Sequence, residues 1–360
     1  MTIDLLFQEI RGPITKDILA KARGLKKIAV SGVEFELNGP YLNVDCCIDY
    51  IKRCIGDPGR TIMRYYEISD VWAFPERGSW ATHKYNAKYR GNWSPWIPRN
   101  VIIYHAHMIA YEKGLLDKYK DEVIESCKNK RGQEKLLCYQ RIILEKIFFP
   151  IIRKLKVLDP FIGSGTTCIE AKVLGVKKCV GVDINPYAAL LAADRVDFTC
   201  NKSTSSNKLL SPYAGNTSIE IFVGDSRELS KIVNDKDFDI VLAHPPYWGI
   251  IRYGGKINGD LSGVRTPREF IEGIREVANE IKKVVKHNAT VAVLIGDTRK
   301  RRHYINLAAD VIEAFVEEGF KLKEVVVKLQ YNMFETMRVW RFPKGFLAIA
   351  KEFLPIFIAP

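Results

Sequence analysis

The sequence lacks the patterns by which metal-binding, secreted and membrane-spanning proteins are usually identified. Its 8 cysteines form no CxxC pair and have no histidine-rich neighbourhood, so no metal site is predicted. The N-terminus has no basic segment followed by an apolar one, so no secretory leader is expected. The most apolar stretch, residues 142–157, carries five charged side chains and is too short to cross a membrane. These absences predict a soluble cytoplasmic protein with no membrane contact and with reduced cysteines.

Acidic residues are scarce relative to basic ones. Lys and Arg number 55 against 42 Asp and Glu, which gives the 360-residue chain a formal net charge of +13. This surplus favours a polyanionic partner, because each phosphate that a protein neutralises releases counterions from nucleic acid. The alternative is a basic, soluble protein without such a partner, and charge alone does not decide between the two.

Continuous apolar runs alternate with helical patterns from residue 155 onward. The runs, typical of strands covered on both faces, lie at residues 155–161, 177–184, 219–225, 238–246 and 290–297. Helical patterns stand between them at residues 166–174, 186–197, 268–285 and 305–318. The alternation predicts an α/β fold with a doubly wound, mostly parallel sheet in a domain spanning residues 151–360.

The first 150 residues are predicted to form two further parts. Residues 1–100 are interpreted as an α-rich or irregular N-terminal segment, and residues 71–100 within it are too rich in Pro and Gly for long regular elements. Residues 101–150 are predicted to be a helical insertion with a charged middle.

A glycine-rich turn, Asp159–Thr167 (DPFIGSGTT), follows the first strand of this domain. Gly163 and Gly165 would let the backbone turn tightly and approach a ligand where a side chain would clash. The N-terminus of the next helix could direct free N–H groups toward an anion. Such a turn could equally serve a nucleotide, so by itself it does not identify the ligand.

Acidic residues end the next two strands as well. Asp183 ends the second strand and Asp225 the third, and their carboxylates could accept hydrogen bonds from ribose hydroxyls and from an amino group. The alternative for any one of these acids is a helix cap or a turn. Three acids in order at one edge of the sheet favour a ligand site.

These motifs resemble the S-adenosylmethionine motifs of the DNA amino-methyltransferases, which methylate N4 of cytosine or N6 of adenine. The resemblance implies a Rossmann-like class I methyltransferase fold with S-adenosylmethionine as cofactor. It also implies that the glycine-rich turn holds the methionine part, Asp183 the ribose and Asp225 the adenine. The residues assigned to cofactor binding in this way are Asp159, Phe161, Gly163, Ser164, Gly165, Thr166, Asp183, Asn185 and Asp225.

The segment Asn92–Asn100 resembles the family segment that completes the cofactor pocket. In the family that segment precedes the DPF motif directly, whereas here it lies nearly 60 residues upstream. Residues 101–150 are therefore interpreted as an insertion between the two.

The motif His244-Pro245-Pro246-Tyr247 ends the fourth strand and is predicted to be catalytic. An exocyclic amine is a poor nucleophile because its lone pair is delocalised, and acceptors that hold its hydrogens favour the reactive pyramidal geometry. The first side chain and the carbonyl of the first proline can supply two such acceptors, and two consecutive prolines keep that carbonyl fixed. Tyr247 could stack on a base flipped out of its duplex.

This motif resembles the family's (D/N/S)PP(Y/F), with a departure at His244. A neutral imidazole still offers one acceptor nitrogen, so activity is expected to fall as the pH drops through the pKa of His244. The alternative is a packing histidine before a turn.

The histidine also leaves the target base open. In the family SPPY tends toward cytosine N4 and DPPY or NPPY toward adenine N6, whereas the trailing Trp248 favours cytosine. Cytosine C5 is disfavoured, because that chemistry needs a cysteine nucleophile, usually after proline, and the chain has no Pro-Cys dipeptide. The alternatives are an adenine-N6 enzyme, a guanine-N2 enzyme acting on tRNA, and an inactive DNA-binding protein.

Double-stranded DNA is the predicted partner. Interleaved cations and aromatic rings suit phosphate contact and base stacking, and a basic loop follows the strand at 290–297. The residues predicted to contact DNA are Arg90, Trp93, Arg99, Arg299, Lys300 and Arg301. The alternatives are that the rings pack the cofactor pocket and that the loop is only solvated. A restriction endonuclease is considered as a further partner, and a monomer and a homodimer both stay open.

Overall fold

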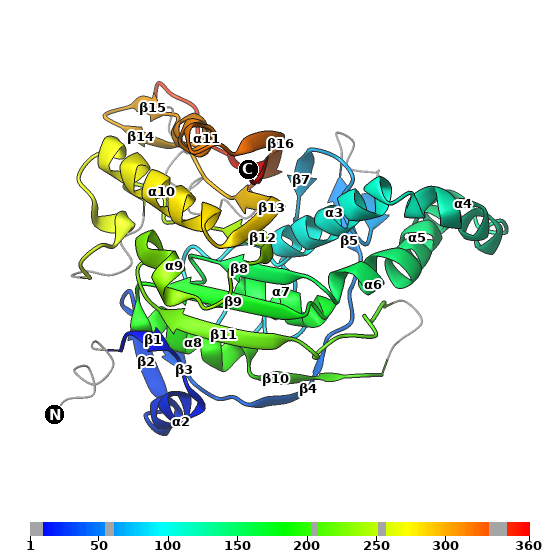
Figure 1. Ribbon diagram of the computed structural model, residues 1–360, viewed down its shortest axis with the longest axis horizontal. Helices are drawn as coiled ribbons and strands as arrows, with labels where there is room; N and C mark the ends of the chain where they lie inside the picture. The colour runs from blue at the N-terminus through cyan, green and yellow to red at the C-terminus, as the bar shows by residue number, and fades with distance from the viewer. Residues whose placement is uncertain (1–9, 55–60, 204–207, 251–256, 331–343) are drawn as a thin grey trace.

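A computed structural model describes residues 10–54, 61–203, 208–250, 257–330 and 344–360 (Figure 1). Its centre is a nine-stranded sheet in the order β1-β11-β9-β8-β12-β13-β17-β16-β7. Five parallel strands form the middle of this sheet: β8 (Lys156–Asp159), β9 (Lys178–Asp183), β11 (Ser218–Val223), β12 (Phe238–Ala243) and β13 (Val285–Val293). Four of them coincide with apolar runs in the sequence, whereas β13 begins five residues before the predicted run at 290–297 and ends within it.

The order of the parallel strands creates a switch point. Counted along the chain, the order β11-β9-β8-β12-β13 is 3-2-1-4-5, so the winding reverses between β8 and β12. Antiparallel β17 (Lys351–Ile358) lies between β13 and β16 (Lys321–Leu329). β1 (Gly12–Pro13) and β7 (Val71–Ala73) form the two edges. Ligands of such sheets bind beyond the carboxyl ends of the strands at the switch point.

Helices cover both faces of the sheet. Two separate hydrophobic clusters fill the spaces between helices and sheet. One contains residues of α3 (Trp96–Glu112), α7 (Thr166–Leu174) and α8 (Pro186–Val196). The other contains residues of α9 (Leu229–Ile232), α10 (Pro267–Lys282) and α11 (Leu307–Glu317). The predicted doubly wound α/β fold is confirmed.

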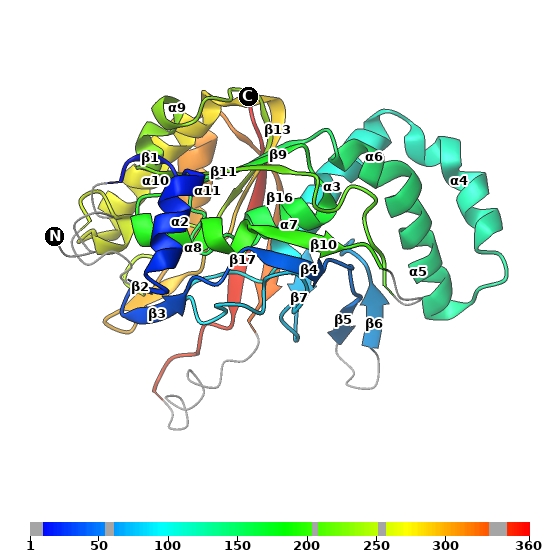
Figure 2. The ribbon, with the colours of Figure 1, turned by 90° about the horizontal axis from the view of Figure 1, so that it is seen from below.

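The N-terminal segment differs from its prediction. Where the structure describes residues 10–95, they hold one helix, α2 (Lys16–Gly24), together with short strands and irregular segments, so this part is irregular and not α-rich. The strands beyond β1 and β7 are β2 (Lys27–Val30), β3 (Val33–Glu36), β4 (Tyr41–Asp45), β5 (Ile51–Cys54) and β6 (Thr61–Arg64). α2 and β2 pack on α8, and β4 pairs with β10 (Phe198–Asn201), so the segment wraps the outside of the domain that holds the nine-stranded sheet (Figure 2).

Residues 101–150 are helical, as predicted. They contain most of α3, then α4 (Leu115–Ser126), α5 (Gly132–Ile143), the π-helix η1 (Leu144–Phe148) and the start of α6 (Phe149–Ile152). The predicted boundary at residue 100 falls inside α3, which is buried against α7 and β12 because its surface is apolar nearly all round. Of this region, only the α4–α5 hairpin projects from the sheet (Figure 1).

The prediction of reduced cysteines is wrong. The structure joins three pairs: Cys46–Cys200, Cys127–Cys138 and Cys168–Cys179. They link the residue after β4 to β10, the residue after α4 to α5, and α7 to β9. The two cysteines of each pair are 154, 11 and 11 residues apart in the sequence, so no short sequence motif predicts the pairing.

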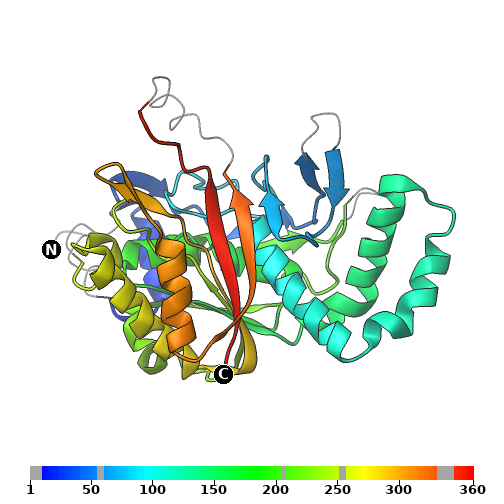
Figure 3. The same cartoon turned by 90° about the horizontal axis from the view of Figure 1, so that it is seen from above.

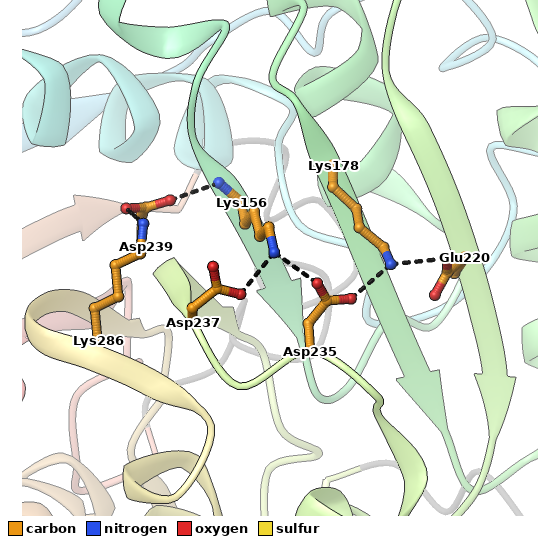
Figure 4. A network of polar contacts seen from close by, with 7 residues as sticks. All are labelled: Lys156, Lys178, Glu220, Asp235, Asp237, Asp239 and Lys286. Carbon is orange, nitrogen blue, oxygen red and sulfur yellow. Dashed lines mark hydrogen bonds and ion pairs between the residues drawn. The ribbon is translucent and has the colours of Figure 1, made fainter.

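Alternating charges line the amino-terminal edge of the sheet (Figure 4). Asp235 bridges Lys156 at the start of β8 and Lys178 at the start of β9, at 2.7 and 2.6 Å. Asp239 on β12 accepts from the backbone N–H of Lys156 and from the ammonium of Lys286 on β13. This network ties four neighbouring strands together at the edge opposite the predicted site.

Within the described ranges, no helix is long and apolar enough to cross a membrane, and no group of His, Cys, Asp and Glu could hold a metal ion.

Candidate active site

A cavity of about 80 Å³ opens at the carboxyl ends of β8, β9, β11 and β12, and we call it the strand-end cavity. Seven of the nine residues predicted to bind the cofactor line it: Phe161, Gly163, Ser164, Thr166, Asp183, Asn185 and Asp225. Asp159 and Gly165 belong to the glycine-rich turn but do not line this cavity.

Asp159 braces this turn. Its carboxylate accepts hydrogen bonds from the backbone N–H of Phe161, at 2.9 Å, and from the hydroxyl of Thr167 in the first turn of α7. Burial raises the pKa of Asp159 to about 7, and the nearby charge of Asp183 adds to the shift. Asp159 therefore shapes the turn that meets the ligand and does not itself face the cavity.

Both glycines of the turn have a left-handed backbone, with φ of +51° at Gly163 and +86° at Gly165. A Cβ at Gly165 would lie 3.1 Å from the Cα of Ala192 on α8. Glycine is therefore needed at residue 165 for backbone conformation and for the close packing of α7 against α8.

Asp183 faces the strand-end cavity from the end of β9. Its two oxygens accept from the backbone N–H groups of Gly163 and Asn185, at 2.9 and 2.8 Å. Because each carboxylate oxygen has two lone pairs, Asp183 keeps acceptor capacity for a ligand. Burial raises its pKa to about 6, and Asp260 across the cavity adds to this.

Asp225, at the end of β11, is engaged by its own neighbour. Arg227 donates to it from its backbone N–H at 3.0 Å and forms an ion pair with it at 2.6 Å. Asp225 still lines the strand-end cavity, but its charge is largely compensated there.

His244 lies in the wall between two cavities. An adjoining cavity of about 390 Å³ shares Gly91, Asn92, Trp93 and His244 with the strand-end cavity. The ring of Trp93 stacks on the imidazole with centroids 5.3 Å apart and planes 12° apart. Burial lowers the pKa of His244 to about 4, so the side chain is neutral at pH 7.

The other residues of the catalytic motif divide between the cavities. Pro246 lines the strand-end cavity, whereas Pro245 and Tyr247 line the adjoining one. The hydroxyl of Tyr247 donates to Glu352 at 2.8 Å and lies 3.0 Å from Nε2 of His244. Tyr247 is thus fixed by hydrogen bonds, which the prediction of a stacking ring had not included.

Two of the residues predicted to contact DNA are buried. Arg99 is wholly inaccessible, pairs with Glu170 of α7 at 3.0 Å and lies over the rings of Trp80 and Trp96. A DNA contact by Arg99 is therefore wrong, because an acid 71 residues away draws it into the core. Trp93 is 5% exposed and packs in the cavity wall, and Arg90 alone of the three is exposed.

The three cations predicted after β13 lie on or beside a hairpin of β14 (Thr298–Lys300) and β15 (His303–Ile305). It projects at the edge of the sheet where β16 ends (Figure 3). Arg299 donates to the carbonyl of Leu347 at 3.0 Å, whereas Lys300 and Arg301 are exposed. The ammonium of Lys300 lies 4.8 Å from the ring centroid of Trp248, directly after the catalytic motif, so hairpin and motif share one rim.

Some polar groups of the site have no partner in the described structure, and two of its acids could not be identified from the sequence. Both side-chain polar atoms of Asn92 and the hydroxyls of Ser94 and Ser164 are buried and have no hydrogen-bond partner in the part of the chain that the structure describes. Asn92 and Ser94 belong to the segment singled out by resemblance, but Asp260 and Glu352 carry no sequence signal.

The strand-end cavity fits S-adenosylmethionine in charge and polarity. Asp183 and Asp260 face it, and neither has an ion-pair partner among the described residues, which suits a ligand with cationic ammonium and sulfonium groups. The orphaned polar atoms of Asn92 and Ser164 require hydrogen-bonding groups from a ligand or water.

Comparison with known proteins gives a family and two curated relatives. The model of a DNA methylase family matches residues 139–194. The type II methyltransferase M.SmaI of Serratia marcescens is 30% identical over 81 residues, which are 22% of this chain and 27% of that protein. A putative protein N5-glutamine methyltransferase of Methanocaldococcus jannaschii is 26% identical over 195 residues, 53% of this chain and 83% of that one. The matched part thus spans about a quarter of the first relative and most of the second.

Among solved structures, TrmN from Thermus thermophilus aligns with a TM-score of 0.36 and 16% identity, over 59% of this chain and 48% of that one. The fold assignment rests on the strand order and not on this alignment. Together, the sequence match over residues 139–194 and the strand-end cavity confirm the resemblance to the DNA amino-methyltransferases and identify an S-adenosylmethionine-dependent methyltransferase fold.

Proposed function

We propose that the protein transfers a methyl group from S-adenosylmethionine to an exocyclic amine of a base in double-stranded DNA, with N4 of cytosine as the target. The observation that carries this proposal is the position of His244 in the wall shared by the two cavities. One cavity suits the cofactor, and the other has the size of a small-molecule site.

Different residues of the chain would bind the cofactor and hold the amine. Asp183, Asn92 and Ser164 would bind S-adenosylmethionine, which supplies an activated methyl group. His244, neutral at pH 7, would accept a hydrogen bond from the amine, and the carbonyl of Pro245 would accept a second. With a pKa of about 4 for His244, the expected loss of activity on acidification lies near pH 4.

Cytosine is preferred over adenine because of Trp248. Its resemblance to the residue that trails the motif in the cytosine-N4 group supports this choice, and methylation of adenine N6 is the alternative. A restriction endonuclease partner belongs to this proposal as well, in view of the type II relative.

A second candidate acceptor is the side-chain amide of a protein glutamine. The archaeal relative, which matches over 53% of this chain, is named for that reaction. A glutamine amide and a base amine are both planar NH₂ groups conjugated to a ring or carbonyl, so one pair of acceptors suits either. The net charge of +13 supports nucleic acid over protein.

The role of His244 can be tested by separating transfer from cofactor binding. We expect His244→Ala to lower methyl transfer to duplex DNA at least about 100-fold, because one amine acceptor is lost. Calorimetric affinity for S-adenosylmethionine should change little. His287→Ala, an exposed histidine at the opposite edge of the sheet, is the matched control. Full activity of His244→Ala would remove the histidine from the mechanism.

A further inference from the structure

We propose that Glu352, acting through Tyr247, is the positioning residue that makes His244 the proton acceptor for the reacting amine. This inference rests on the proposed transfer to an amine. Glu352 lies on β17, more than 100 residues after the catalytic motif, and lines the adjoining cavity beside Tyr247; the mechanism above gives it no part.

A chain of hydrogen bonds fixes which imidazole nitrogen is free. The carboxylate of Glu352 can only accept, so the single hydroxyl hydrogen of Tyr247 points to it, at 2.8 Å. The oxygen of Tyr247 then accepts from Nε2–H of His244, at 3.0 Å. Nδ1 is therefore the nitrogen that keeps a lone pair.

Neighbouring residues hold the hydrogen bonds between Glu352, Tyr247 and His244 in place. Glu352 is 8% exposed and forms an ion pair with Lys328 of β16 at 2.6 Å, which lowers the pKa of the carboxyl despite its burial. Gly296 leaves room for the phenol, since a Cβ there would lie 2.6 Å from the Tyr247 ring. Glu352 and Lys328 are also the charged groups that act on His244.

The hydrogen-bonded series Glu352–Tyr247–His244, which we call the relay, can take up the proton that methyl transfer releases. When the amine nitrogen gains the methyl group, one of its N–H bonds breaks and the proton goes to Nδ1 of His244. The imidazolium so formed donates from Nε2 to Tyr247, and the carboxylate of Glu352 balances its charge through that hydroxyl. No other reactant is required.

With histidine at residue 244, the reaction depends on the carboxylate of Glu352; with an asparagine amide at that position it would not. An asparagine at residue 244 has its own fixed acceptor oxygen and gains no charge, so it would need no carboxylate behind it. The effects of residues 244 and 352 should therefore be strongly coupled.

Kinetics of single and double variants test this coupling. Glu352→Gln and Tyr247→Phe should each lower kcat roughly 10- to 100-fold, the equivalent of one hydrogen bond to a charged group, with cofactor affinity unchanged. In a His244→Asn background, Glu352→Gln should cost less than about 3-fold. Glu324→Gln, which removes the charge from another Tyr–Glu pair, between Tyr104 of α3 and Glu324 of β16, is the matched control. An equal loss in both backgrounds would mean a merely structural role and would overturn the proposal.

Nitrogen NMR of the resting protein gives a readout that needs no activity. At pH 7 His244 should be the neutral Nε2–H tautomer, and Tyr247→Phe should yield a mixture of tautomers. An Nδ1–H tautomer in the unaltered protein would overturn the relay. If DNA receives no methyl group but the tautomer is as expected, the acceptor assignment fails while the relay stands.

Discussion

At the scale of single residues, the site has two carboxylates, Asp159 and Asp183, that form no ion pair with any residue that the structure describes. Asp183 and Asp159 are held by backbone and hydroxyl donors, and burial raises their pKa values to about 6 and about 7. The ionised forms are therefore costly in the free protein, and a cationic ligand would relieve that cost. The two acids differ in place, because only Asp183 lines the cavity.

We expect Asp183→Asn to weaken S-adenosylmethionine binding roughly 10- to 100-fold, since a charged acceptor at the cavity wall is lost. Isothermal titration calorimetry measures this directly. Asp237→Asn, a half-exposed acid at the opposite edge, serves as control. Unchanged affinity in Asp183→Asn would exclude this carboxylate from the cofactor site.

The affinity for S-adenosylmethionine should also depend on pH. The pKa of Asp183 is raised from its usual value to about 6, so the carboxylate protonates in the free protein as the pH falls through 6. A cationic ligand prefers the ionised form, and affinity should then fall by up to about tenfold per pH unit below that point. Titrations between pH 5 and 8 check this, and Asp183→Asn should flatten the curve.

Asp183 should affect the stability of the free protein in the opposite direction: cofactor affinity rises with pH, whereas the stability contributed by this group falls. Because its folded pKa is raised, Asp183 favours folding below its unfolded pKa near 4, and that contribution is lost as the pH rises through about 6.

At the scale of elements, the β14–β15 hairpin joins the basic surface to the catalytic motif. Its turn residues Arg301 and Arg302 both have positive φ, of 50° and 71°, which is the geometry of a two-residue type I′ turn. Arg299 anchors the hairpin to Leu347, and Lys300 lies against Trp248. The exposed cations are thus displayed at a fixed place beside the site.

We expect Lys300→Gln with Arg301→Gln to weaken duplex DNA binding and to lower the slope of log affinity against log salt by roughly 2, one for each phosphate contact. Fluorescence anisotropy at 50–300 mM salt measures the slope. Lys113→Gln with Lys120→Gln, at the far end of the molecule near α4, is the control pair. Equal slopes for both pairs would mean that the hairpin does not contact phosphate.

Elements of the domain could be predicted where one local pattern determines them. α7 begins and ends at the predicted residues, Thr166 and Leu174, and every parallel strand overlaps a continuous apolar run. The N-terminal strands could not be predicted, because they are short and some of them pair with distant partners, as β4 does with β10. Glu170 and Glu352 could not be predicted either, because each is far in sequence from its partner. Glu170 pairs with the buried Arg99, and Glu352 accepts a hydrogen bond from Tyr247.

At the scale of the whole molecule, covalent and ionic ties hold the N-terminal segment and the sheet together. Cys46–Cys200 joins residues 154 apart and fastens β4 to the methyltransferase domain. The charge network at the amino-terminal edge connects β8, β9, β12 and β13 (Figure 4). Neither the disulfide nor the charge network lies at the carboxyl edge of the sheet, where the two cavities are.

We expect Cys46→Ser to destabilise the protein by roughly 2–4 kcal/mol, because the closed loop is long and its loss enlarges the unfolded ensemble. Cys127→Ser, which opens a loop of 11 residues between α4 and α5, should cost less. Thermal unfolding with and without a thiol reductant measures both. Identical melting temperatures in oxidised and reduced protein would show that the disulfides do not contribute to stability.

The central claim is transfer to an exocyclic amine of a DNA base, and the most direct test identifies the methylated product. The protein is incubated with methyl-labelled S-adenosylmethionine and with duplex DNA, tRNA or a glutamine-containing protein, and the digests are analysed by mass spectrometry. The account predicts N4-methylcytosine in the DNA digest, and its loss in His244→Ala. N6-methyladenine would change the base but keep the claim. Label confined to tRNA or to glutamine, with none in DNA, would contradict it.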